Sequence, residues 1–199
     1  MNNGFVRSAF DKGYYHRFYE DPATRAVDEA EFHRLVDHVV HYLKYLEVSV
    51  KRVLDVGCGL GMWRQALKTH YPGMRYTGMD KSKHICKKYG WKRGSVTSLT
   101  SRTPYDLIIC QSVFQYLNAK DVRAGIRNLA AVCRGAMYLE IVTKDDWNQN
   151  CDRAATDGAI YLRTVDWYRK AISRYFINGG GGIFLPKDSP IVLYELEKI

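Results

Sequence analysis

The sequence predicts an α/β fold with a doubly wound, mostly parallel sheet and helices on both of its faces. From Arg52 to about residue 142, short apolar segments alternate with longer amphipathic ones. The short segments are apolar on both faces, as strands inside a parallel sheet are, and alternation of strand and helix is typical of that architecture. Residues 175–199 contain two strand-like runs, which predict an antiparallel hairpin at the end of the sheet.

A helix over about residues 28–47 is expected before the sheet. Its apolar side chains recur at three- and four-residue steps and form one buried stripe, comprising Phe32, Leu35, Val36, Val39, Leu43 and Leu46. The strands expected before the hairpin cover residues 52–56, 75–79, 91–93, 105–110 and 136–142. The helices expected among and after them cover residues 61–70, 82–89, 119–133 and 165–174. The glycine run at 179–182 is interpreted as a corner before the hairpin, whose loop would hold Pro186 and Pro190.

With the two strands of the hairpin, the expected sheet has seven strands in one domain over residues 1–199, since the sequence shows neither a repeat nor a long linker. The sheet core is expected within residues 50–199. Residues 1–27 form an aromatic segment that we interpret as a lid or cap over the site. The polar stretch over residues 143–164 carries no predicted element.

Composition limits the classes to which the protein can belong. Hydrophobic residues make up 46% and charged residues 26% of the chain, which excludes a disordered or coiled-coil protein. No apolar run approaches the ~20 residues of a membrane-spanning helix, and the first residues lack the apolar stretch of a signal peptide. We therefore expect a cytoplasmic protein with no membrane contact. The cysteines form no C-x-x-C pair, so reduced thiols and no metal site are expected.

The charge balance favours anionic partners. The chain has 30 Lys and Arg against 21 Asp and Glu, a formal net charge of +9. Small anionic molecules and nucleic acids both fit this charge. Because the basic residues are scattered rather than gathered in a run, nucleic acid is not favoured.

The most informative motif lies where the first strand of the sheet meets the next helix. Gly57, Gly59 and Gly61 stand at alternate positions, and Asp55 precedes them inside the strand. Glycine allows a sharp turn and close approach of the backbone to a ligand, while the helix behind it presents unpaired N–H groups. The pattern predicts a nucleotide-type site. A dinucleotide fingerprint would need glycine where Met62 stands, and the Gly-Lys-Ser/Thr ending of a Walker loop is absent, so a dehydrogenase is the least favoured enzyme.

An acid stands at the end of the second strand of the sheet. A carboxylate at the place of Asp80 can accept hydrogen bonds from ribose hydroxyls in nucleotide-binding sheets. An acid at a strand end also commonly caps the next helix, and Ser82 is a second candidate for that cap. The pairing of Asp80 with the glycine loop favours the ribose interpretation.

The segments LDVGCGLG at 54–61 and GMD at 78–80 resemble the first two motifs of the class I, Rossmann-like S-adenosylmethionine-dependent methyltransferases. The resemblance extends over roughly residues 50–142. It implies methyl transfer with S-adenosylmethionine as cofactor and S-adenosylhomocysteine as product. It also implies that the glycine loop holds the amino-acid end of the cofactor, that Asp80 binds the ribose, and that Lys81 flanks the adenine. The residues implied around the cofactor are Asp55, Gly57, Cys58, Gly59, Gly61, Asp80, Lys81, Ser95, Val96, Gln111 and Ser112.

Two later segments follow the family pattern less closely. Gly94-Ser95-Val96 stands where the family often has Gly-Asp-Ala, so Ser95 or the Val96 backbone N–H would face the adenine. Gln111 and Ser112 leave the carboxyl end of the strand at 105–110, the edge at which open α/β sheets bind ligands. Asp106 begins that strand at the opposite edge and is expected to be structural.

The sequence does not identify a catalytic residue. Methyl transfer from a sulfonium is an in-line displacement in which positioning and exclusion of water supply much of the rate. A base is needed only when the acceptor must lose a proton early. Glu140 and Tyr15 are candidates, although a hydrogen-bonded structural carboxylate explains Glu140 as well. The candidates for contact with the acceptor are Tyr14, Tyr15, Tyr19 and Trp147, and packing of the aromatic segment explains the tyrosines equally well.

A small-molecule acceptor, for which an anion fits the charge, is the favoured substrate. An RNA methyltransferase is one alternative, supported by the net charge, and a cofactor-binding subunit without turnover is another. Cys110 lacks the preceding proline of cytosine-methylating enzymes because Ile109 stands there, which argues against a nucleobase as acceptor.

Overall fold

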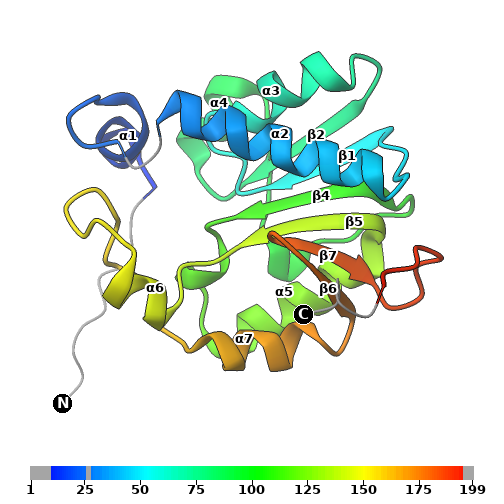
Figure 1. Ribbon diagram of the computed structural model, residues 1–199. Coiled ribbons are helices and arrows are strands. Elements are labelled where there is room, and N and C mark those ends of the chain that lie inside the picture. Colours follow the sequence, from blue (N-terminus) through cyan, green and yellow to red (C-terminus); the bar gives the residue numbers. More distant parts are fainter. Residues whose placement is uncertain (1–9, 26–27, 195–199) are drawn as a thin grey trace.

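Seven strands form one sheet in the part of the chain that the structure describes, residues 10–25 and 28–194 of a computed structural model (Figure 1). Their order is β3-β2-β1-β4-β5-β7-β6. The strands are β1 Arg52–Val56, β2 Arg75–Asp80, β3 Lys92–Arg93, β4 Tyr105–Gln111, β5 Cys133–Glu140, β6 Phe176–Gly180 and β7 Ile183–Pro186. Neighbours from β3 to β5 pair in parallel, whereas β7 pairs antiparallel with β5 and β6. The predicted α/β architecture is confirmed.

Helices cover both faces of the sheet because the central strands are apolar on both faces. The helices are α1 Lys12–Tyr15, α2 Glu29–Tyr45, α3 Met62–His70, α4 Lys83–Tyr89, α5 Ala119–Val132, α6 Lys144–Gln149 and α7 Val165–Ile172. A π-helical turn, His16–Glu20, continues α1, and short 3₁₀ turns cover Val96–Ser98 and Phe114–Tyr116. In β4, Leu107 and Ile109 share a core with α2 and α3. The alternate residues Ile108 and Cys110 share the other core with α5 and α7.

The helices and strands predicted before the hairpin agree with the observed bounds within two residues, except at the start of β5. β5 begins at Cys133 rather than at residue 136, directly after α5 and without a connecting loop. Gly135 allows this early start, because a Cβ there would lie 2.2 Å from the backbone oxygen of Asp106 in β4.

The predicted position of the hairpin loop is wrong. β6 and β7 are joined at Gly181 and Gly182, so the glycine run forms the turn itself. Gly180, Gly181 and Gly182 have φ values of 84°, 55° and 80°, a left-handed backbone that glycine adopts without strain. Pro186 ends β7, and Pro190 follows in a segment without an assigned strand as far as residue 194.

The polar stretch over residues 143–164 contains α6, which the sequence did not predict. Thr143 and Asp146 form a capping box at the start of this helix, in which the side-chain oxygen of each residue accepts from the backbone N–H of the other. α6 has no buried residue and therefore no apolar stripe to reveal it.

The described part of the aromatic segment lies at the edge of the sheet where β4 ends (Figure 1). Residues 1–9 and 26–27 of the segment lie outside the described residues. The Ser82 hydroxyl donates to the carbonyl of Phe10 at 2.6 Å, and the hydroxyls of Tyr14 and Tyr116 share a hydrogen bond of 2.9 Å. The segment is thus fastened to the loops that follow β2 and β4.

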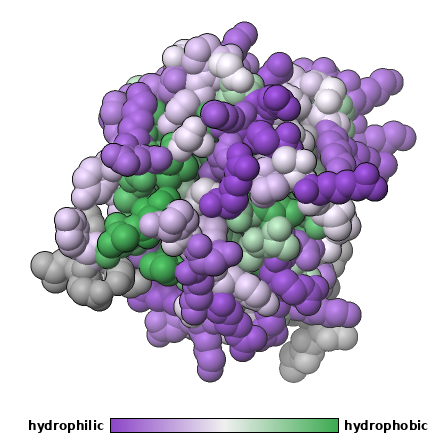
Figure 2. Space-filling model, turned by 90° about the vertical axis from the view of Figure 1, so that its right-hand side faces the viewer, coloured by the Kyte–Doolittle hydropathy of each residue, from purple (hydrophilic) through white to green (hydrophobic). Residues whose placement is uncertain are grey.

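The side of the molecule away from α1 and α6 shows mainly hydrophilic side chains with apolar areas between them (Figure 2). No helix within residues 10–25 and 28–194 combines the length and the apolar character that crossing a membrane requires. The glycine loop and the aromatic segment lie at the opposite edge, where the parallel strands end.

Candidate active site

The loop between β1 and α3 has the backbone that its glycines predict. Gly57, Gly59 and Gly61 have φ values of 73°, 47° and 80°, all in the left-handed region. A Cβ at Gly57 would lie 2.5 Å from Cγ2 of Val113, and one at Gly61 would lie 2.6 Å from the ring of Trp91. The Trp91 indole also donates to the carbonyl of Gly59 at 2.9 Å. The neighbouring side chains therefore hold this loop in one shape.

Asp80 holds the same loop from the end of β2. Its buried carboxylate accepts from the backbone N–H of Gly59 at 3.0 Å and from that of Ser82 at 2.7 Å. The Tyr15 hydroxyl donates to both of its oxygens, at 3.4 and 3.5 Å. The side chain that caps α4 is Ser82, which accepts from the N–H of Ile85 at 3.3 Å. The N-cap of α4 is thus Ser82 and not Asp80.

A cavity of about 410 Å³, here called the outer cavity, opens beside Asp80. It brings together most of the residues predicted around a cofactor, namely Gly57, Gly59, Asp80, Lys81, Ser95, Val96, Gln111 and Ser112. Tyr14, Tyr15 and Tyr19 form the wall contributed by the aromatic segment. The outer cavity is therefore walled partly by the sheet edge and partly by the aromatic segment.

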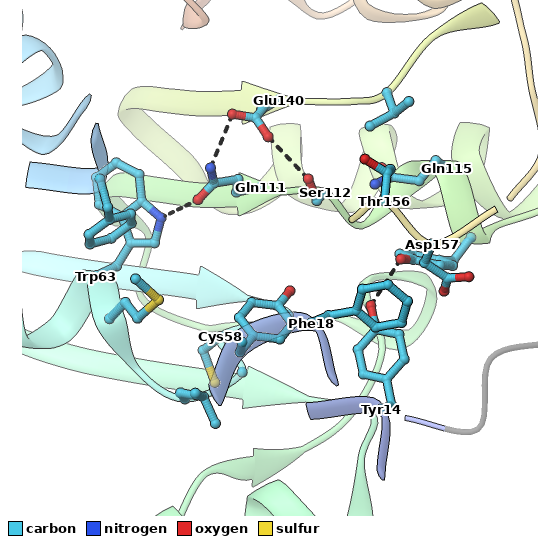
Figure 3. Close-up of a pocket in the computed structure, with 18 of the residues that line it drawn as sticks. Tyr14, Phe18, Cys58, Trp63, Gln111, Ser112, Gln115, Glu140, Thr156 and Asp157 are labelled. Carbon is cyan, nitrogen blue, oxygen red and sulfur yellow. Dashed lines mark hydrogen bonds between the residues drawn. The ribbon is translucent and has the colours of Figure 1, made fainter. Parts of the chain in front are cut away.

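A smaller cavity of about 130 Å³, here called the inner cavity, adjoins the first (Figure 3). The two cavities share Tyr14, Tyr19, Gly57, Gly59, Gln111, Ser112 and Tyr116 as lining residues. Asp55, Cys58 and Glu140 line only the inner cavity among the residues that the sequence singled out. The geometry thus provides two adjoining chambers at the carboxyl edge of the sheet.

Glu140 sits at the centre of a hydrogen-bond network that joins β4, β5 and α3 (Figure 3). Its carboxylate accepts from Nε2 of Gln111, from the Ser112 hydroxyl and from the Tyr138 hydroxyl, each at 3.0 Å. Oε1 of Gln111 in turn accepts from the Trp63 indole at 2.8 Å. Ser112 has a left-handed φ of 54°, which is uncommon for a residue with a side chain. The network therefore positions Gln111 and Ser112 at the boundary between the two cavities.

Asp55 is a buried carboxyl group inside β1. The Tyr76 hydroxyl donates a short hydrogen bond to it. Burial raises the pKa of Asp55 to about 7. The hydrogen bond from Tyr76 acts in the opposite direction, and the negative charge of Asp80 adds to the rise. The pKa of this carboxyl group at the wall of the inner cavity is thus well above its ordinary value.

The tyrosine hydroxyls of the aromatic segment are held in the neutral form. Burial raises the pKa of Tyr14 and Tyr15 far above its ordinary value, and it raises the pKa of Tyr19 to about 12. Tyr15 lines the outer cavity and faces Asp80, whereas it is absent from the lining of the inner cavity. The structure thus gives the candidate base Tyr15 a place beside the predicted ribose-binding carboxylate.

Two predicted residues lie in neither cavity lining. Gly61 is the N-cap of α3, and Trp147 stands on α6 with the guanidinium of Arg153 above its ring at 5.5 Å. Residues that line the inner cavity without having been predicted are Phe18, Phe32, Leu60, Met62, Trp63, Gln115, Tyr116, Val142, Ala155, Thr156 and Asp157. Gln115 and Tyr116 follow β4 at the carboxyl edge, so their place was open to prediction. Thr156 and Asp157 lie in the loop after α6, where no pattern marks them.

Comparison with known proteins agrees with this geometry. A family model described as a methyltransferase domain matches residues 54–135. The curated malonyl-[acyl-carrier protein] O-methyltransferase of Legionella pneumophila is 40% identical over 55 residues, which span 26% of this chain and 19% of that protein. The similar segment is therefore about a fifth of the relative's length.

Solved structures share the fold. The plantazolicin methyltransferase BpumL, in complex with a pentazolic desmethylPZN analog and SAH, is 14% identical with a TM-score of 0.60, and the match covers 81% of this chain and 72% of that one. CalS10, a SAM-bound amino pentose methyltransferase from Micromonospora echinaspora, is also 14% identical with a TM-score of 0.60, covering 90% of this chain and 98% of that one. Residues 54–135 are thus similar to a methyltransferase domain, and the described chain shares its fold with solved S-adenosylmethionine-dependent methyltransferases.

Proposed function

We propose that this protein transfers the methyl group of S-adenosylmethionine to a small-molecule acceptor. The observation that carries the proposal is the pair of adjoining cavities at the carboxyl edge of the sheet. Asp80 lines the outer cavity, the glycine loop lines both cavities, and Gln111 and Ser112 lie at their boundary. A cofactor with its ribose at Asp80 and its amino-acid end at the glycine loop would present its methyl group to the inner cavity near this boundary.

The outer cavity fits the cofactor in size and chemistry. Its volume of about 410 Å³ lies within the range of small-molecule sites. A side chain on Gly57 would overlap Val113, another residue of the cavity wall. Only glycine fits at this point, and its backbone forms the wall there. Asp80 would accept from the ribose hydroxyls, and Ser95, Val96 and Lys81 would surround the adenine. When bound, S-adenosylmethionine supplies a methyl group already activated by the sulfonium charge.

The protein's own contribution to the reaction is positioning. The network around Glu140 sets the direction of Gln111 and Ser112. The aromatic segment contributes part of the wall of the inner cavity, which would limit the access of water. We assign Glu140 to positioning, because its oxygens already accept three hydrogen bonds. A general base remains necessary only for an acceptor that must lose a proton.

The size of the inner cavity favours a small molecule over RNA, because about 130 Å³ accommodates only a few heavy atoms. The net charge of +9 favours anionic partners in general, nucleic acid included. A subunit that binds the cofactor without turnover differs from an enzyme in a single respect, which is the absence of methyl transfer. A cytoplasmic location remains our expectation from the sequence.

Calorimetric titration with S-adenosylmethionine, S-adenosylhomocysteine and NAD tests the proposed function. We expect dissociation constants on the order of micromolar for the two adenosyl compounds and no heat from NAD. Absence of binding by both adenosyl compounds would contradict the assignment of the outer cavity, and the proposal of an enzyme would then be withdrawn.

We further propose that the aromatic segment acts as a lid in which Tyr15 occupies the place of a ribose hydroxyl. Tyr15 is 5% exposed and donates to Asp80, the carboxylate assigned to the ribose. Because the Tyr15 hydroxyl competes with the ribose, Tyr15→Phe should tighten the binding of S-adenosylmethionine by about two- to fivefold in the same titration.

Tyr42→Phe is the matched control for this lid experiment. It removes a hydroxyl that donates to the carbonyl of Gly179 at 2.6 Å, and Tyr42 lines neither cavity. We expect unchanged affinity in this control. Weaker binding by Tyr15→Phe alone would show that the hydroxyl contacts the cofactor and does not compete with it.

A further inference from the structure

Basic side chains gather on α4 and β3, at the end of the sheet where β3 is the edge strand. Residues 81–93 contain no Asp or Glu. Their lysines and arginine are all exposed and are here called the basic strip, comprising Lys81, Lys83, Lys87, Lys88, Lys92 and Arg93. The two elements that carry the strip are in contact with each other. One exposed surface thus holds a fifth of the 30 Lys and Arg residues of the chain.

Most cations of the basic strip lack a counter-charge. Lys88 lies 3.4 Å from Glu20, whereas none of the other five forms an ion pair with any residue that the structure describes. Lys83 and Lys87 stand one turn apart on α4, a spacing at which like charges repel each other. An anionic partner on this surface would relieve that repulsion.

Part of the basic strip forms the rim of the outer cavity. Lys81, Lys83 and Arg93 line this cavity, and Asp80 is the one acid among its described lining residues. The proposed cofactor offers these three cations no partner, because its single carboxylate is assigned to the glycine loop and its sulfonium and amino groups are cationic. None of the basic strip lines the inner cavity. The strip therefore indicates an anion other than the cofactor, bound outside the inner cavity.

Aromatic rings stand beside the basic strip. The rings of Tyr89 and Trp91 are stacked, with centroids 6.0 Å apart and an interplanar angle of 19°. The Lys88 ammonium lies 5.0 Å from the centroid of Tyr89, and the exposed Arg64 guanidinium lies 5.6 Å from that of Trp91. Both rings are partly exposed. Cations for phosphates and aromatic rings for bases are the two components of surfaces that bind single-stranded nucleic acids, whereas an acidic protein would use the charges alone.

From the exposed basic strip, its cations at the rim of the outer cavity and the aromatic rings beside it, we infer that α4 and β3 form a docking surface for a single-stranded nucleic acid. The phosphates contact the lysines and Arg93, and a base stacks against Tyr89. This inference goes beyond the proposed function and does not rest on it. The nucleic acid is a partner bound outside the inner cavity, and the methyl acceptor remains a small molecule.

The salt dependence of binding tests the inference. The full chain is titrated into a fluorescein-labelled oligouridylate dodecamer, and binding is followed by fluorescence anisotropy. We expect a dissociation constant on the order of micromolar at about 50 mM salt and a loss of affinity of about 100-fold at about 200 mM. The expected slope of log affinity against log salt is about −3.5, because each neutralised phosphate of a single strand contributes roughly −0.7 and five cations of the strip lack a partner. Absence of binding at the lower salt concentration, or a slope near zero, would overturn the inference.

Two double variants with the same loss of charge locate the surface. Lys87→Gln with Lys92→Gln changes two residues of the strip that line neither cavity. Lys170→Gln with Lys187→Gln changes two exposed residues beside β6 and β7, at the opposite end of the strand order. We expect the first pair to weaken oligouridylate binding by about tenfold and to make the slope shallower by about 1.4, and the second pair to change neither. Equal losses in both double variants would show attraction by the net charge alone and would overturn the docking surface.

A labelled glutamate dodecapeptide distinguishes a nucleic acid from an acidic protein. We expect the wild-type protein to bind oligouridylate about fivefold or more tightly than this peptide, since only the nucleotide has bases that stack on the rings. Tyr89→Leu should remove this difference by weakening oligouridylate binding alone. Equal or tighter binding of the peptide, or an unchanged oligouridylate affinity in Tyr89→Leu, would overturn the assignment to a nucleic acid.

Titration of S-adenosylhomocysteine into the same proteins separates this inference from the proposed function. The Lys87 and Lys92 double variant should keep the wild-type affinity for S-adenosylhomocysteine, because neither residue lines a cavity. A wild-type protein that binds oligouridylate but not S-adenosylhomocysteine would contradict the proposed function and leave the docking surface supported. The reverse result would overturn the docking surface alone.

Discussion

Replacing Asp80 with alanine should weaken the binding of S-adenosylmethionine by about 10- to 100-fold. The variant removes the carboxylate assigned to the ribose, and a lost charged hydrogen bond changes a binding free energy by roughly 1–3 kcal/mol. It also leaves the N–H groups of Gly59 and Ser82 without their acceptor, so the glycine loop loses its support. Calorimetric titration measures the change directly. Asp80→Asn, which keeps the size of the side chain, gives the same test if the alanine variant does not fold.

Asp106→Ala is the control for this experiment, because it removes an equally buried carboxylate from the opposite edge of the sheet. Asp106 accepts from the backbone N–H groups of Lys51 and Arg52 at 2.8 and 2.7 Å and from Arg134 at 2.6 Å. We expect it to lower the melting temperature without changing the affinity for the cofactor. Wild-type affinity in both Asp80 variants would exclude the ribose assignment.

Gly135→Ala should destabilise the fold by about 3 kcal/mol, because the new methyl group would overlap a backbone atom that cannot move aside. A Cβ at Gly135 would lie 2.2 Å from the carbonyl oxygen of Asp106 and 3.0 Å from its carbonyl carbon. To relieve this overlap β5 must shift away from β4, which would displace Glu140 from Gln111 at the far end of the same pair of strands. Thermal unfolding should show a loss of about 6–12 °C.

The matched control is Gly73→Ala in the exposed turn before β2. Nothing lies within 4 Å of a Cβ at Gly73, and its φ is not in the left-handed region. We expect a change of less than about 1 kcal/mol there, with a slight gain through the unfolded state. Equal melting temperatures for the two variants would show that β4 and β5 are not packed as closely as described.

The features of this protein that sequence reasoning predicted are those with a local cause. The strand before Gly57 is apolar on both faces, and alternate glycines directly after it leave few other interpretations, so the loop, β1 and α3 were all predicted within two residues. Asp80 follows from the same logic, since the ends of neighbouring parallel strands meet at one edge. The place of Asp106 at the far edge also follows from its position in the strand.

What sequence reasoning missed depends on contacts between distant segments. The turn at Gly181 could be distinguished from a corner only by knowing that β7 enters the sheet beside β5. Asp157 reaches the inner cavity through a loop without periodicity, and Trp147 lies outside it although both residues come from the same polar stretch. Asp55, Glu140 and Asp157 all line the inner cavity, which the composition did not reveal because the net charge of a whole chain does not show where its acids lie.

The wall that the two cavities share has a consequence for the order of events in turnover. Tyr14 and Tyr19 line both cavities, so the inner cavity is complete only when the aromatic segment is in place. If the cofactor enters by displacing this segment, the acceptor cannot be held before the cofactor has arrived and the segment has returned. Such an enzyme would follow a compulsory-order kinetic scheme, with S-adenosylhomocysteine released last and competing only with S-adenosylmethionine.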